Sequence, residues 1–88
     1  MPARRVTALT LPVDVRSAVA FEAYRDRTPL LTIMTARPAL LVTLTLPARL
    51  DAGHVRFARD LAAMSARYAT EVERAWRGLP SLTAPRAS

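Results

Sequence analysis

A chain of 88 residues is too short to divide its apolar residues between two independent cores, so we expect one domain at residues 1–80 and a flexible tail at 81–88. Hydrophobic residues make up 51% of the sequence, more than so small a globule can bury, and the absence of cysteine excludes disulfides, thiolate metal sites and cysteine nucleophiles. The chain contains arginine but no lysine, a composition typical of a GC-rich genome. Because such coding bias favours arginine at exposed positions, the net charge of +6 is only a weak indication of an anionic partner.

Apolar and polar residues alternate from residue 9 to residue 23, which is the period of a β-strand. The odd positions hold the apolar set Leu9, Leu11, Val13, Val15, Val19 and Phe21. Because Pro12 and Ser17 interrupt this run, we expect it to bend or to divide into two strands.

Two further apolar runs, LLTIMTA at 30–36 and ALLVTLTL at 39–46, flank the dipeptide Arg37–Pro38 and predict a β-hairpin. In the second run one face holds leucine and valine (Leu40, Val42, Leu44 and Leu46), whereas Thr43 and Thr45 share the other. This pattern suits a sheet with one buried face.

A long amphipathic helix is predicted from Asp51, a good N-cap, to about Leu79, with Gly78 and Pro80 as stop signals. Its length of about 40 Å exceeds the width of a globule of this size, so the helix must break, for example near Ser65, or extend onto a partner. The predicted fold is therefore α+β: an antiparallel β-meander of three to four strands followed by one long C-terminal helix. We expect this helix to pack across one face of the sheet.

Two segments imitate targeting signals. Residues 2–20 resemble a signal peptide with an Ala-x-Ala cleavage site, but Pro12, Asp14 and Arg16 disfavour that interpretation. Residues 30–46 have the length of a short membrane span, but Arg37 and Pro38 at their centre favour two strands. We therefore expect a cytoplasmic protein with no membrane span.

Five arginines fall within about 80° of one another on the predicted helix, opposite its apolar arc. They are Arg56, Arg59, Arg67, Arg74 and Arg77. The row could follow a phosphate backbone, but acids at spacings of three and four offer the pairs Arg56–Asp60, Arg67–Glu71, Arg74–Glu71 and Arg77–Glu73. We favour a solvated face with internal salt bridges.

A basic sheet edge is a second candidate nucleic-acid interface, although strand edges also carry charge to discourage aggregation. The candidate nucleic-acid contacts are Arg4, Arg5, Arg37 and Arg49, with Arg59 on the helix. The segment VTLTLPARL, Val42 to Leu50, followed by an amphipathic stretch, resembles the opening of a ribbon-helix-helix DNA-binding domain. It covers nine residues, and the chain departs from that family because a hairpin precedes the strand and no glycine divides the helix.

No set of residues for acid-base, metal or nucleophilic chemistry is visible, and the single histidine, His54, is expected to pack or to cap the helix. We therefore expect a small non-catalytic protein with no cofactor that regulates or assembles through protein contacts, as a homodimer or with an unidentified protein. Aromatic and large apolar residues of the helix form the expected interface: Phe57, Leu61, Met64, Tyr68, Val72 and Trp76. A basic nucleic-acid-binding module, such as a DNA-binding regulator, is the alternative.

Overall fold

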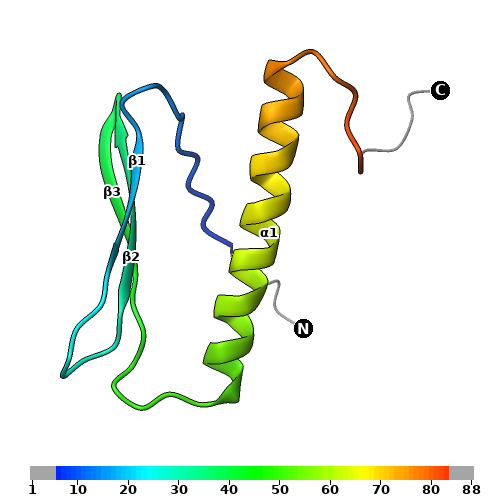
Figure 1. The fold of residues 1–88 in the computed structure, drawn as a ribbon. Coiled ribbons are helices and arrows are strands. Elements are labelled where there is room, and N and C mark those ends of the chain that lie inside the picture. Colours follow the sequence, from blue (N-terminus) through cyan, green and yellow to red (C-terminus); the bar gives the residue numbers. More distant parts are fainter. Residues whose placement is uncertain (1–5, 84–88) are drawn as a thin grey trace, which may run out of the picture. The chain divides into compact units, whose positions relative to one another are not determined.

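The structure is a computed structural model that describes residues 6–83. The chain divides into two units, the first ending at Ala48 and the second beginning at Arg49. The first contains strands β1 (Ala18–Glu22), β2 (Leu30–Ala36) and β3 (Ala39–Leu44), and the second contains helix α1 (Ala52–Trp76) (Figure 1). The predicted α+β class is confirmed, with a three-stranded antiparallel meander followed by a single C-terminal helix.

The sheet has the order β1-β2-β3, and its register places apolar residues of all three strands side by side. Since residues directly opposite one another in a ladder point to the same side, these rows define one apolar sheet face. It comprises the row Val19, Ile33 and Val42, the row Phe21, Leu31 and Leu44, and Leu40. The opposite face is mixed: it has the apolar row Ala18, Met34 and Leu41 and the row Ala20, Thr32 and Thr43, in which the two threonine hydroxyl oxygens lie 3.4 Å apart.

The hairpin between β2 and β3 has the predicted two-residue connection, Arg37–Pro38, whose peptide bond is cis. At this end the Thr35 hydroxyl donates a hydrogen bond of 2.8 Å to the carbonyl oxygen of Pro38. At the other end the Thr28 hydroxyl donates to the carbonyl oxygen of Leu46, which ties the segment before β2 to the segment after β3. Side-chain hydrogen bonds therefore close both ends of the hairpin.

The strand predicted upstream of Ser17 is absent among residues 6–83, so the sheet has no fourth strand there. A local turn replaces it. The Asp14 carboxylate accepts a hydrogen bond from the amide of Arg16 at 2.8 Å, and the Asp14 carbonyl accepts one from the amide of Ser17 at 3.0 Å. These bonds commit the backbone to a turn immediately before β1 begins.

Helix α1 runs without interruption for 25 residues, so the break considered near Ser65 does not occur. The predicted N-cap is confirmed, because the Asp51 carboxylate accepts from the amides of Gly53 and His54 at 2.7 and 3.4 Å. The His54 side chain completes a capping box, since its Nδ1 accepts from the amide of Asp51 at 2.9 Å. His54 is thus a capping residue.

The helix ends two residues before the predicted stop signal, Gly78, which has a φ of 73°. The amide of Gly78 donates to the carbonyl of Ala75, and the amide of Leu79 donates to the carbonyl of Arg74. This pair of bonds is a Schellman motif, in which glycine supplies the left-handed conformation. No helix among residues 6–83 has the length and apolarity required to cross a membrane.

Candidate interaction surfaces

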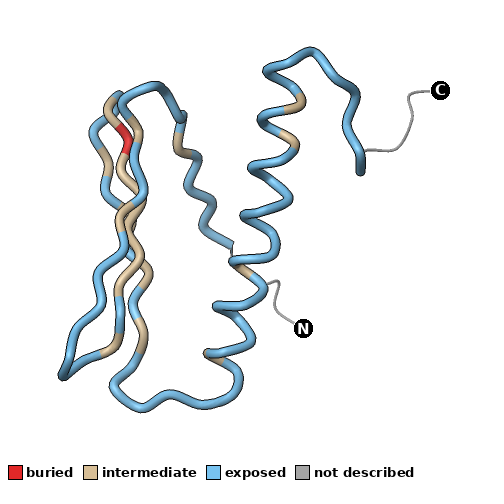
Figure 2. The backbone as a smooth tube through the Cα atoms, viewed as in Figure 1, coloured by how far each residue is buried: buried red, intermediate tan, exposed pale blue. Residues whose placement is uncertain are grey.

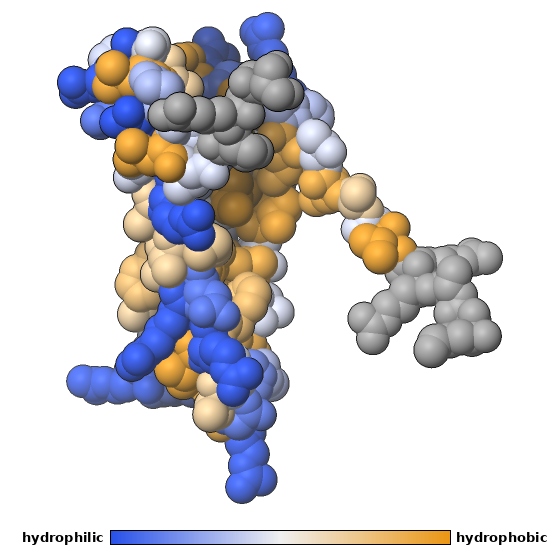
Figure 3. Space-filling model, turned by 90° about the vertical axis from the view of Figure 1, so that its right-hand side faces the viewer, coloured by the Kyte–Doolittle hydropathy of each residue, from blue (hydrophilic) through white to orange (hydrophobic). Residues whose placement is uncertain are grey.

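Apolar side chains are exposed in both units. Among residues 6–83 no hydrophobic residue is buried, and the one buried residue is Thr35, at 6% exposure (Figure 2). Apolar atoms, orange in Figure 3, lie at the surface beside charged ones. Neither unit by itself therefore contains the buried apolar core from which folded domains gain most of their stability.

The residues predicted as an interface form an apolar surface on α1. At 100° per residue they fall within an arc of about 120°, which we call the helix apolar face. It comprises Phe57, Leu61, Met64, Tyr68, Val72 and Trp76. Leu61 is half-buried and the other five are exposed, Tyr68 at 66% and Trp76 at 81%.

The apolar sheet face is a second apolar surface, and its residues were not among those predicted as an interface. Val19 and Phe21 of β1 are exposed, whereas Ile33 in the central strand is half-buried between its neighbours. The alternation in β3 gave the signal for this face: Val42 is half-buried and Thr43 exposed, as predicted. A sheet with one such face requires a covering layer.

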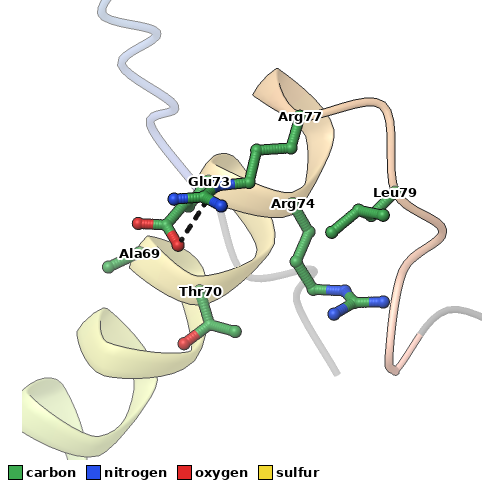
Figure 4. Close-up of a pocket in the computed structure, with 6 residues that line it drawn as sticks. All are labelled: Ala69, Thr70, Glu73, Arg74, Arg77 and Leu79. Atoms are coloured by element: carbon green, nitrogen blue, oxygen red, sulfur yellow. Dashed lines mark ion pairs between the residues drawn. The ribbon is translucent and has the colours of Figure 1, made fainter.

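The arginine row carries fewer salt bridges than its spacing predicts. Among residues 6–83 the one arginine–carboxylate ion pair lies between Arg77 Nε and Glu73 Oε2, at 3.7 Å (Figure 4). The pairs predicted for Asp60 and Glu71 do not form, because spacing sets which side chains can reach one another but not which partner they choose. The prediction of a largely salt-bridged face is therefore wrong in three of its four pairs.

Glu71 is engaged instead by the segment Leu79–Thr83, which we call the C-terminal hook. Its carboxylate accepts a hydrogen bond of 3.0 Å from the amide of Leu82, and it is also hydrogen bonded to the side chain of Ser81. Beside it, Arg74 Nε donates to the carbonyl oxygen of Pro80 at 2.8 Å. The beginning of the predicted flexible tail is thus attached to the helix, while residues 84–88 lie outside the described residues.

The hook lowers the pKa of the Glu71 carboxyl below its usual range. The hydrogen bonds from Ser81 and Leu82 are the main causes, and the nearby charges of Arg74 and Arg67 add to them, whereas desolvation opposes them.

Next to the hook, Figure 4 shows a shallow hollow lined by Ala69, Thr70, Glu73, Arg74, Arg77 and Leu79. The Arg77–Glu73 pair forms part of its wall.

Acidification is expected to release the hook. Because the pKa of Glu71 is lowered in the folded chain, its bonds to the hook are present above the pKa of an unfolded glutamate and are lost as the pH falls through the folded value. An NMR titration of the Leu82 amide should therefore show one transition below the pH range of ordinary glutamates. Glu71→Gln should remove it and Glu73→Gln should keep it, whereas a transition that survives Glu71→Gln would contradict the assignment.

The candidate nucleic-acid contacts within the described residues are divided between the two units. Arg37 lies in the hairpin turn of the first unit, whereas Arg49 precedes α1 and Arg59 lies on it in the second. Arg4 and Arg5 lie outside the described residues. Within residues 6–83 no group of three or more histidine, aspartate or glutamate side chains is arranged to hold a metal ion.

Comparison of the chain with models of protein families, with curated proteins and with solved structures found no match. The two apolar faces and the arginine row are therefore the basis for a functional proposal.

Proposed function

We propose that this is a small non-catalytic protein that acts in regulation or assembly through protein contacts, as a homodimer built on α1. The observation that carries the proposal is that no apolar residue among 6–83 is buried, although 51% of the sequence is hydrophobic. Burial of a single leucine or phenylalanine side chain contributes about 1.5–3 kcal/mol. Because neither unit buries such a side chain by itself, we expect the core to form by association, and we propose a second copy as the partner.

The lengths of the elements support association with another chain. Helix α1, with 25 residues, is about 37 Å long, whereas the longest strand, with seven residues, spans about 23 Å. A sheet with strands of this length, aligned along the helix, would leave about 14 Å of it uncovered, which corresponds to two or three helical turns. A second copy is the simplest cover, because two-fold homodimers are the commonest soluble oligomers.

The chemistry of the helix apolar face also supports a protein partner. Phe57, Met64, Tyr68 and Trp76 are of the residue types that are enriched in protein interfaces. The opposite side of the helix carries charge, so the apolar side is distinct.

Since the sequence contains no cysteine, we propose a reducing compartment, the cytoplasm, as the site of action.

Sedimentation equilibrium at micromolar concentration tests the proposal. The expected mass is twice the 9.7 kDa of the chain. A monomer that is folded under these conditions would contradict the proposal, because the chain would then fold without a second copy.

A second candidate function is binding to nucleic acid. It is favoured by the finding that Arg56 and Arg59 form no ion pair among residues 6–83, together with the net charge of +6. Counterion release predicts that affinity for DNA or RNA falls steeply as salt rises. In a gel-shift titration, the variant Arg37→Ala/Arg49→Ala should flatten this dependence, and the absence of any salt-sensitive shift would remove the candidate.

A further inference from the structure

We infer that the second copy lies antiparallel along α1, with the two-fold axis passing between the two helices at the level of Ala62 and Ala63. The inference rests on the proposed homodimer and adds the direction and register of its helix pair. It follows from the position of four apolar residues along the helix and from the charges that flank them.

Phe57, Leu61, Met64 and Tyr68 follow one another at spacings of four, three and four, which is the seam of a heptad repeat. Leu61 and Tyr68 then occupy a positions, and Phe57 and Met64 occupy d positions. The seam ends at Tyr68, because the next d position is Glu71, whose carboxylate is hydrogen bonded to the C-terminal hook. It is therefore a short segment, centred between residues 62 and 63.

An antiparallel pair packs the a residues of one helix against the d residues of the other. Centring the two copies on the middle of the seam places Phe57 opposite Tyr68 of the second copy, and Leu61 opposite Met64. By symmetry both contacts occur twice, so each seam residue meets a large apolar side chain. A shift by one heptad toward the C-terminus would place Leu61 opposite Glu71, and a shift toward the N-terminus would place Tyr68 opposite Leu50, which precedes the helix.

The flanking charges select the antiparallel direction. Asp60 and Arg67 occupy the g positions immediately before the two a residues. When one helix is reversed, the same flanks of both helices meet, and this register brings Asp60 of each copy beside Arg67 of the other. A parallel pair would place Asp60 near Ser65 and Arg67 near Val72 of the second copy, with no opposite charge for either.

Both charged groups are available for such a contact. Among residues 6–83 the Asp60 carboxylate has no hydrogen bond or ion pair, although Arg56 stands four residues before it. Arg67 forms no ion pair there either, and its Nη1 lies 3.9 Å from the Met64 sulfur, beside the seam. On the other flank, Ala58 and Ser65 are small enough to let two helix backbones approach.

Spin-label distances test the direction, and the absence of native cysteine allows single labels. In the antiparallel dimer, labels on Arg77→Cys should lie about 43 Å apart along the helix axis. Labels on Ala63→Cys, level with the two-fold axis but on the outer side of each helix, should be separated only by the width of the helix pair. Similar short distances at both positions would show a parallel dimer and overturn the inference while leaving the homodimer intact, whereas a folded monomer would overturn both.

Charge reversal tests the register. Asp60→Arg or Arg67→Asp each introduces two like-charge contacts per dimer and should raise the dissociation constant about tenfold. The double variant Asp60→Arg/Arg67→Asp restores opposite charges and should return the constant to near the wild-type value. Arg59→Asp, on the far side of the helix, is the matched control and should have little effect. Failure of the double variant to recover affinity would overturn the register.

Discussion

Replacement of Leu61 and Tyr68 together by glutamate is expected to convert the dimer into a monomer and to unfold much of α1. Each dimer loses four large apolar contacts, each worth about 1.5–3 kcal/mol, and gains four carboxylates on the helix apolar face. The dissociation constant should therefore rise by at least about a thousandfold. An isolated helix is only marginally stable in water, so far-ultraviolet circular dichroism should fall together with the sedimentation mass.

The matched control is Ala63→Glu/Thr70→Glu, which adds the same two charges on the opposite side of α1. These positions are exposed and lie on the arginine row, where carboxylates have cationic neighbours. The control should keep the dimer mass and the helix content of the wild type. If Leu61→Glu/Tyr68→Glu retains both properties as well, the helix apolar face is not the interface.

Two adjacent residues of β3 give the second large expected effect. Val42 belongs to the apolar sheet face and Thr43 to the opposite face. If the apolar sheet face is covered in the assembled protein, Val42→Asp buries a carboxylate there in place of a valine, which should destabilise the fold by at least about 3 kcal/mol. Thr43→Asp adds the same carboxylate on an exposed position and should change stability by less than about 1 kcal/mol.

Urea unfolding followed by circular dichroism compares these two variants directly. A sheet of three strands with no covering layer is marginal in water, so Val42→Asp should lower the unfolding midpoint far more than Thr43→Asp. Equal midpoints for the two variants would show that the apolar sheet face stays in contact with water in the assembled protein.

The elements that could be predicted from the sequence are those with strong local signals. Asp51 and Gly78 mark the ends of α1 because their side-chain and backbone preferences act within a few residues. The hairpin around Arg37–Pro38 was predicted because its strands are adjacent in the chain. Alternation upstream of Ser17 gave a wrong strand, since a strand needs a neighbour to pair with and the Asp14 turn competes locally.

The candidate site was predictable to a similar extent. The helix apolar face follows from spacings of three and four, so the residues that share it could be named from the sequence, while their role as an interface stays a prediction. The C-terminal hook could not be predicted, because its bond from Leu82 to Glu71 spans eleven residues and depends on the turn at Gly78. That same bond occupies the Glu71 carboxylate, which explains why the predicted salt bridges from Arg67 and Arg74 to Glu71 are absent.

Thermal unfolding at several protein concentrations tests most directly whether folding depends on association. If the apolar core forms between copies, the midpoint temperature should rise steadily over about a hundredfold increase in concentration, because mass action favours the folded dimer. A midpoint that stays constant over this range, with a sedimentation mass of one chain, would contradict the proposal that this protein completes its core with a second copy.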